Sequence, residues 1–284
     1  MKTKYYKYRT LYQATATGRE ENLFTKSIFK KAEIFYATPK SCNDPFDCNL
    51  RLHVRDSTDQ EWETYIMKRI AADPTGRPEL ERVLSQKLWK SNPAIAADVG
   101  GSTQKQLHEE SSLFCLSKIG NSIPMFAYYA DSHTGIAVEF EFDETEVPCG
   151  ISFGDPTDRN TWYDRKIIFG DVKYPAGMPE LNFHRLHNAS ADELVRSLMF
   201  SKAQEWTHEK EFRIFRRQVP AATVQFERPM LTRVILGCRA TDTEQDLVRL
   251  WLAGWPTDVV IAKVEPMTEK FELAIRDIET IKGT

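Results

Sequence analysis

The chain has 284 residues, a formal net charge of −3 and a sequence pI of about 6.1. This charge excludes a uniformly basic nucleic-acid-binding surface, and the 41% hydrophobic and 28% charged composition is that of a globular protein. No apolar run approaches the roughly 18 residues that a membrane helix needs, and the first residues lack the apolar core of a signal peptide. A cytoplasmic protein without membrane contact is therefore expected.

The first predicted elements are short. Residues 4–9 are rich in tyrosine, which is typical of a strand, and apolar residues at helical spacing predict a helix at about 20–31. Residues 33–38 predict a strand that Pro39 ends. Residues 43–47, Asn-Asp-Pro-Phe-Asp, are dense in turn formers and predict a tight loop.

A polar, proline-punctuated segment at about 58–110 predicts a helical insertion. Strands dominate afterwards, at 112–117, 135–142, 167–174, 211–216, 233–236 and 258–264. A compact turn or helix is predicted at 124–130, and helices are predicted at 192–203 and 243–251. The connections are too uneven for regular βαβ units. The sequence therefore predicts one α+β domain over 1–284 with a central mixed sheet and a helical insertion.

Cysteine and histidine spacing gives no metal signature. The five cysteines are scattered and odd in number, and none forms a C-x-x-C pair, so they are expected to be reduced thiols that mostly fill the core. Only His184 and His187 lie at close spacing, without a cysteine beside them. No metal site is expected.

The stretch around Glu209 and Glu211 carries the strongest functional signal. The two acids are two residues apart at the start of a predicted strand, so both side chains are expected on one face. One acid would stabilise an oxocarbenium-like centre, and the other would orient or deprotonate an acceptor. A solvated edge strand with a Glu211–Arg213 ion pair explains the same residues as well.

Other residues give weaker signals. Arg9 ends the first strand beside aromatic residues, and its planar guanidinium suits a phosphate or pyrophosphate. Thr38 offers a hydroxyl at the end of its strand, where a turn or cap role is commoner. Asp131 and His133 lack the G-x-S-x-G motif of a hydrolase, so His133 is expected to be a structural loop histidine. No Walker loop and no G-x-G-x-x-G occurs.

Four sequence blocks together resemble a family of bacterial proteins of uncharacterised function. The blocks are Lys7-Tyr8-Arg9, Asn43-Asp44-Pro45-Phe46-Asp47, Met125-Phe-Ala-Tyr-Tyr129-Ala-Asp131-Ser-His133-Thr-Gly135 and Trp206-x-x-Glu209-Lys-Glu211-Phe-Arg213. Phe126 stands where that family usually carries Trp, and Cys42 where it usually carries Phe. The resemblance covers most of the chain and by itself implies no activity.

A looser resemblance implies an activity. An arginine on the first strand, a hydroxyl-bearing strand and a Glu-x-Glu pair opening a later strand are similar to the ADP-ribosyltransferases, which implies a split mixed sheet and NAD as substrate. The implied catalytic residues are Glu211, which holds the ribose hydroxyl as nicotinamide leaves, and Glu209, which serves the acceptor. The implied NAD-binding residues are Arg9 for the phosphates, Thr38 for the ribose, and Tyr36 or Tyr129 against the nicotinamide ring.

The hydroxyl strand is the weakest part of this resemblance. The residues around Thr38 read Tyr-Ala-Thr-Pro where the ADP-ribosyltransferases carry Ser-Thr-Ser, and the gap to Glu211 is longer than usual. The strand at 112–117, with Ser112 and Ser117, is the other candidate for this role.

The expected function is ADP-ribosyl transfer from NAD to a nucleic acid or protein, without a metal, by a toxin or antiphage effector with an antitoxin as partner. Two alternatives stay open. One is a nuclease or phosphohydrolase in which Asp44, Asp47, Glu209 and Glu211 hold a divalent cation. The other is a non-catalytic binding module of a toxin–antitoxin or defence system.

Overall fold

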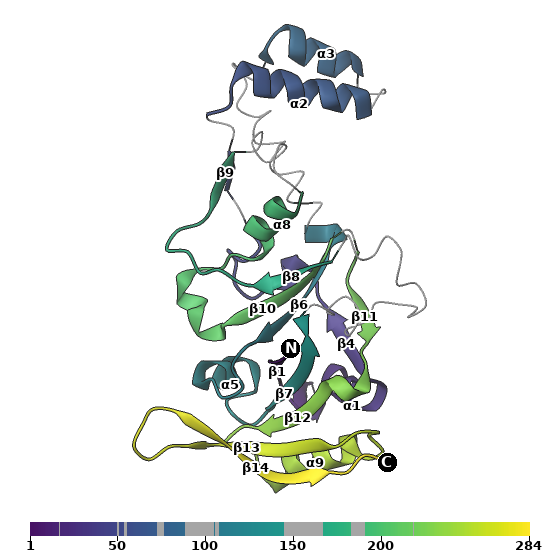
Figure 1. Cartoon of the computed structure of the whole chain (residues 1–284), viewed down its shortest axis with the longest axis vertical. Coiled ribbons are helices and arrows are strands. Elements are labelled where there is room, and N and C mark those ends of the chain that lie inside the picture. The colour runs from purple at the N-terminus through teal and green to yellow at the C-terminus, as the bar shows by residue number, and fades with distance from the viewer. Residues whose placement is uncertain are drawn as a thin grey trace. The chain divides into compact units, whose positions relative to one another are not determined.

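A computed structural model describes most of the chain in two compact units (Figure 1). The described residues are 1–16, 18–49, 51–53, 56–72, 77–88, 105, 108–144, 167–182, 191–217 and 219–284. Unit 1 comprises Met1–Ala37, Ser112–Val172 and Glu205–Thr284, and unit 2 comprises Thr38–Ser111 and Lys173–Gln204. The segment predicted as a helical insertion belongs to unit 2.

Unit 1 is built on an eight-stranded mixed sheet in the order β14-β13-β12-β7-β1-β6-β10-β8. Its strands are β1 (Lys2–Arg9), β6 (Ser112–Ser117), β7 (Ile136–Asp143), β8 (Ile167–Asp171), β10 (Glu211–Arg216), β12 (Leu231–Leu236), β13 (Val259–Pro266) and β14 (Leu273–Ile281). Only β12 and β13 form a parallel pair in this sheet, and helix α9 (Asp242–Leu252) connects them. The predicted α+β class with a mixed sheet is confirmed.

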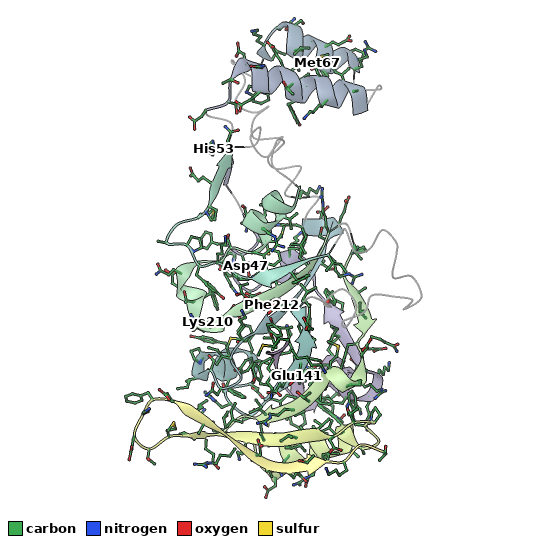
Figure 2. The ribbon with its side chains drawn as sticks, in the orientation of Figure 1. Asp47, His53, Met67, Glu141, Lys210 and Phe212 are labelled. Atoms are coloured by element: carbon green, nitrogen blue, oxygen red, sulfur yellow. The ribbon has the colours of Figure 1, made fainter. Side chains whose placement is uncertain are left out.

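The sheet buries apolar side chains on both faces. On one face, Tyr5, Phe140 and Phe212 belong to one buried apolar cluster with Trp251 of α9 and with residues of helix α1 (Leu23–Lys31); Phe212 is labelled in Figure 2. We call this side the α9 face. On the opposite side, which we call the α5 face, the Tyr8 ring meets Phe126 of helix α5 (Ile123–Tyr129) edge-on at 5.0 Å between ring centroids. Because strand side chains alternate, each residue of β1 belongs to one of these faces.

Smaller elements surround the sheet of unit 1. Strand β4 (Glu33–Tyr36) pairs with β11 (Ala222–Gln225), and β2 (Tyr12–Thr15) pairs with β3 (Gly18–Glu21). The helix predicted at 20–31 begins only at Leu23, because the residues before it belong to β3 and the Asn22 side chain accepts the Thr25 N–H at 3.2 Å. The short helix η6 (Arg228–Met230) precedes β12.

Unit 2 contains helices α2 (Asp59–Ala72), α3 (Arg77–Ser85) and α8 (Ala191–Met199), and the parallel pair β5 (Arg51–His53) and β9 (Glu180–Asn182). Helices α2 and α3 pack through Trp62, Tyr65 and Ile66 against Leu80 and Val83. The helices predicted early in the 58–110 segment are therefore present, and residues 89–104 lie outside the described residues. None of the helices in the described ranges is long and apolar enough to cross a membrane.

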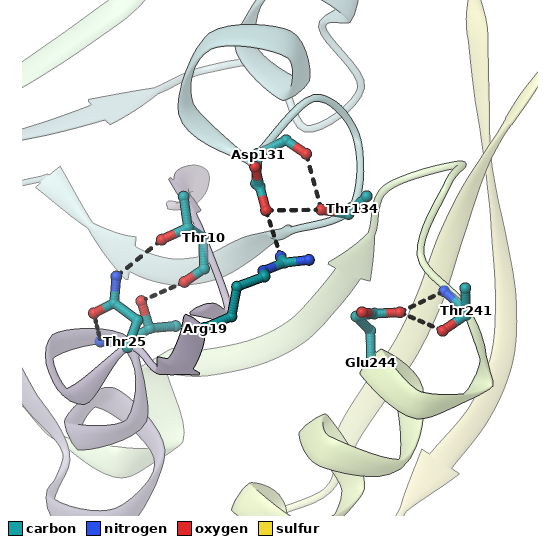
Figure 3. Close-up of polar contacts among 8 residues, drawn as sticks. Thr10, Arg19, Thr25, Asp131, Thr134, Thr241 and Glu244 are labelled. Atoms are coloured by element: carbon teal, nitrogen blue, oxygen red, sulfur yellow. Dashed lines mark hydrogen bonds and ion pairs between the residues drawn. The ribbon is translucent and has the colours of Figure 1, made fainter. Parts of the chain in front are cut away.

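The N-terminus of α9 is stabilised by a capping interaction. The Glu244 carboxylate accepts hydrogen bonds from the Thr241 N–H, at 2.8 Å, and from the Thr241 hydroxyl (Figure 3). The variant Glu244→Ala removes the carboxylate that accepts these two hydrogen bonds. It is expected to lower the free energy of unfolding by about 1 kcal/mol, because α9 loses this capping interaction. Urea titration of this variant, of Glu244→Gln and of the exposed Thr243→Ala measures the effect. The last two variants should stay close to wild type, and an equal loss in Thr243→Ala would contradict the capping role.

Candidate functional site

The backbone between Glu209 and Glu211 changes conformation at Lys210. Glu209 ends the short helix η5 (Gln204–Glu209), Lys210 has a φ of 43°, and Glu211 is the first residue of β10. The prediction that both acids lie in one strand is wrong. The Ser117 hydroxyl donates to the Glu209 carbonyl at 2.6 Å, and the Lys118 N–H donates to the Lys210 carbonyl at 3.0 Å, so β6 holds this turn in place.

Both carboxylates nevertheless lie on the α5 face. Glu211 is paired with Ser117, and Ser117 with Tyr6, so these side chains share one face of the sheet. The Glu209 carboxylate accepts a hydrogen bond of 2.6 Å from the Tyr129 hydroxyl at the end of α5. Glu209 is 4% exposed and Glu211 is 5% exposed, and β10 lies inside the sheet. The interpretation as a solvated edge strand is therefore wrong.

Arg213 fixes the Glu211 carboxylate. Its Nε and Nη2 atoms donate to the two carboxylate oxygens at 2.6 and 3.0 Å, and the arginine is 0% exposed. A two-pronged pair of this kind defines the direction as well as the charge of the carboxylate. The ion pair predicted between these two residues is present, but in the interior of the sheet.

A third buried carboxylate, Glu139, lies in the same row of the sheet. Glu139 is paired with Tyr6 across β7 and β1, and its oxygens accept from the Tyr6 hydroxyl at 3.0 Å, Lys4 Nζ at 3.0 Å and the Thr232 hydroxyl at 2.8 Å. Burial and the neighbouring carboxylate raise the pKa of Tyr6. The sequence did not single out Glu139, because it reads as a polar position in an alternating strand; its burial between neighbouring strands shows only in the sheet.

Aromatic rings follow one another beside Glu209. The Trp206 and His208 ring centroids are 5.9 Å apart, and the His208 and Tyr128 centroids are 6.2 Å apart. Tyr128 is 69% exposed, so this aromatic group reaches the surface of unit 1. Exposed rings next to polar groups are suited to stacking against a flat heterocycle.

Arg9 lies on the α9 face. It is three residues from Tyr6 in β1, so its side chain leaves the sheet on the side opposite Glu211, as does Lys7, whose Nζ is 4.9 Å from the Phe114 ring centroid. Burial lowers the pKa of the Arg9 guanidinium, and its Nε has no hydrogen-bond partner among the described residues. Arg9 and Glu211 therefore do not converge on one face, contrary to the expected single NAD site.

Two more of the predicted ligands of NAD, Tyr36 and Thr38, do not belong to the α5 face of unit 1. Tyr36 is fully buried on the α9 face, 5.4 Å from the Phe114 ring centroid, and the Arg216 guanidinium lies 5.0 Å above its ring. Its ring is thus enclosed in the core, and burial raises its pKa well above the ordinary value. Thr38 belongs to unit 2 and precedes the short helix η1 (Pro39–Ser41), where its carbonyl accepts the Ser41 hydroxyl at 2.7 Å.

The alternative hydroxyl residues, Ser112 and Ser117, lie in β6. The Ser112 hydroxyl donates to the Val219 carbonyl at 2.8 Å, and both serines are buried. Only Ser117 shares a cross-strand row with Glu211. The α5 face therefore brings together Glu209, Glu211, Tyr129 and Ser117.

Asp131 and His133 form a backbone corner after α5. Asp131, Ser132 and His133 have φ values of 47°, 52° and 73°, a run of left-handed residues that non-glycine residues rarely adopt. Arg19 pairs with the Asp131 carboxylate at 2.6 Å, and the Thr134 hydroxyl donates to the Asp131 carbonyl at 2.8 Å (Figure 3). His133 stacks on Phe126, and burial and Arg239 lower its pKa. These contacts fit the structural role expected for His133.

In unit 2, Asp44 and Asp47 shape the predicted tight loop. The Asp44 carboxylate accepts the Phe46 N–H at 2.9 Å, and the Asp47 carboxylate accepts the Cys48 N–H at 2.8 Å. The buried Lys202 Nζ lies 3.6 Å from an Asp47 oxygen. Each acid of this loop thus has a donor within unit 2.

One group of potential metal ligands occurs among the described residues: Cys42, Asp47 and Cys48. The sequence did not single out this group, because Cys42 and Cys48 form no C-x-x-C pair. The loop between them brings the two cysteines together. His184 and His187 lie outside the described residues.

Comparisons of the chain with protein-family models, with curated proteins and with solved structures found no match.

Proposed function

We propose that this protein is an ADP-ribosyltransferase that uses NAD and reacts at the α5 face of unit 1. The observation that carries the proposal is the burial of Glu209 and Glu211 on one face, each held by a donor. Glycosidic bond cleavage builds positive charge on a ribose carbon, and a fixed carboxylate stabilises that charge best where water is excluded. Catalysis of this kind needs few groups beyond those that hold the substrate in place.

Glu211 is assigned to the NAD ribose. The Arg213 fork orients its carboxylate, so that it accepts a ribose hydroxyl and faces the developing charge. Glu209 is assigned to the acceptor, whose proton its carboxylate would take, while the Tyr129 hydroxyl fixes its orientation. Trp206, His208 and Tyr128 are suited to stack against the nicotinamide ring or an acceptor base.

The sheet of unit 1 also supports the resemblance to the split sheet of ADP-ribosyltransferases. Strand β6 changes partner along its length. Its Ser117 pairs with Tyr6 of β1, whereas its Leu113 forms an isolated bridge with Ala37, next to β4. Arg9 and Tyr36 take no part in the proposed reaction, because both residues belong to the α9 face.

The nuclease alternative draws less support from the same contacts. Arg213 pairs with Glu211, and Lys202 lies beside Asp47. A divalent cation would therefore have to compete with these cations for the carboxylates.

NAD cleavage tests the proposal directly. Full-length protein is incubated with NAD labelled in the ADP-ribose part, with RNA, single-stranded DNA or cell protein as acceptor, and nicotinamide release and label transfer are measured. Glu209→Gln is expected to lower the rate at least about 100-fold, the usual contribution of a general base. Tyr129→Phe is expected to lower it less, because the acid stays in place.

Tyr12→Phe is the matched control, since this half-buried tyrosine of β2 packs against the core of the α9 face and not against Glu209 or Glu211. Its rate should equal that of the wild type. Unchanged label transfer to the acceptor in a well-folded Glu209→Gln variant would contradict the proposed role. Phosphodiester hydrolysis that needs Mg²⁺, without nicotinamide release, would instead support the nuclease alternative.

A further inference from the structure

The tight loop of unit 2 folds back on itself. The Asp47 N–H donates to the Asp44 carbonyl at 3.1 Å, and the Asn49 side chain donates to the Pro45 carbonyl at 2.6 Å. Cys48 has a φ of 56°, which turns the chain sharply. The His108 Nε2 atom lies 2.8 Å from the Cys48 carbonyl and holds the end of the loop. The loop therefore has a defined geometry that brings Cys42, before it, close to Cys48, after it.

Three ligand atoms converge inside this loop. The sulfur atoms of Cys42 and Cys48 and a carboxylate oxygen of Asp47 all lie within 4.8 Å of one another. Cys48 and Asp47, which is labelled in Figure 2, are buried, and Cys42 is half-buried. Ligands of a tetrahedral Zn²⁺ ion with bonds of about 2.0–2.3 Å stand about 3.5–3.8 Å apart. A closure of at most about 1.3 Å between these atoms would thus bring them to the separations that a bound Zn²⁺ requires.

We propose that Cys42, Asp47 and Cys48 bind a thiophilic divalent cation, Zn²⁺, with the fourth position open to water. Thiolates select Zn²⁺ over Mg²⁺ and Ca²⁺, which prefer oxygen ligands. Three protein ligands and one open position are also a common arrangement for this ion. The proposal concerns unit 2 and does not depend on ADP-ribosyl transfer.

Charge supports the assignment. Two thiolates and one carboxylate carry a charge of −3, and Zn²⁺ together with the Lys202 ammonium, 3.6 Å from an Asp47 oxygen, supplies +3. The loaded site is therefore neutral, which matters because an unbalanced charge is costly in a buried position. Without the ion, the Cys48 thiol lies 3.6 Å from an Asp47 oxygen, where it acts as a weak donor.

Zinc binding by the full chain tests the proposal. Reduced protein is stripped with EDTA, dialysed and reloaded with ZnCl2, and bound zinc is measured by elemental analysis and by competition with a chromophoric chelator. One zinc per chain is expected. Cys42→Ser should weaken binding by more than about 100-fold, because even residues outside the ligand sphere change metal affinity about 10- to 100-fold. Cys238→Ser, a half-buried thiol in unit 1, is the matched control and should bind zinc like the wild type.

Two further measurements keep the result interpretable. Cobalt substitution should give thiolate-to-cobalt absorption in the wild type and a weaker band in Cys42→Ser. Zinc should raise the melting temperature of the wild type, which requires no variant to fold. Equal zinc affinity in Cys42→Ser and wild type would overturn the proposal. Reduced protein that binds no zinc, and whose Cys42 and Cys48 only form a disulfide on oxidation, would overturn it too.

Discussion

Glu211→Gln is expected to lower the free energy of unfolding by about 3–5 kcal/mol, in addition to any loss of activity. The Glu211 carboxylate and the Arg213 guanidinium are both buried and joined by two hydrogen bonds. Replacing the acid by an amide removes its charge and one acceptor oxygen, and leaves the guanidinium in the sheet without this counter-charge. Urea titration followed by tryptophan fluorescence measures the change.

The double variant Glu211→Gln/Arg213→Met provides the control. Removing both charges together replaces a buried ion pair by groups of similar size, which is often nearly neutral for stability. The double variant should therefore be more stable than the sum of the single changes predicts, by about 0.5–3 kcal/mol. Strict additivity would contradict a direct energetic coupling between the two side chains. Because Glu211→Gln is destabilising, its NAD activity must be measured at a temperature where it is folded.

Gly237→Ala is expected to destabilise unit 1 by about 3 kcal/mol or more, the upper end of the usual cost of overpacking. A Cβ atom at Gly237 would lie 2.1 Å from the His133 carbonyl oxygen. That carbonyl belongs to the run of left-handed residues after α5 and accepts the Arg239 N–H at 3.0 Å. The backbone on both sides is thus already fixed and cannot yield easily. The melting temperature and the urea midpoint measure the effect.

Gly177→Ala is the matched control for this substitution. A Cβ atom at Gly177 would meet nothing within 4 Å, and the residue does not have a positive φ. Its stability should stay within about 0.5 kcal/mol of the wild type, or rise slightly as the unfolded chain loses freedom. A similar loss in both variants would show that glycine flexibility, and not the close approach to His133, explains the effect.

Strands with strong apolar patterns were predictable from the sequence. The strands predicted at 112–117 and 211–216 match β6 and β10, because β6 carries a continuous apolar run and β10 carries aromatic and β-branched residues that favour strands. Strand β14 was not predicted, since it lies at the edge of the sheet and most of its side chains are exposed or half-buried. Local pattern therefore identifies strands with clear apolar runs, including β8 at the other edge of the sheet, and misses β14.

The candidate site was only partly predictable, because its geometry depends on distant partners. The turn at Lys210 is held by Ser117, and the Glu209 carboxylate by Tyr129, residues 92 and 80 positions from Glu209. Likewise, the alternation of side chains along β1 shows that Arg9 and Glu211 lie on opposite faces of the sheet only once the pairing of Tyr6 with Ser117 is known. Sequence spacing gives the relative phase of residues within one strand, whereas register between strands is a tertiary property.

The central position of β1 in the sheet has a consequence for synthesis on the ribosome. The first neighbour of β1 to be synthesised is β6, whose Ser117 pairs with Tyr6, and the second is β7, whose Glu139 bonds to Lys4 across 135 positions. At about 5–20 residues per second, β1 waits about 6–22 s after emerging before its first partner is made. Throughout that time both of its edges are open to other nascent chains. Its lysines at positions 2, 4 and 7 supply the positive charge that discourages such pairing.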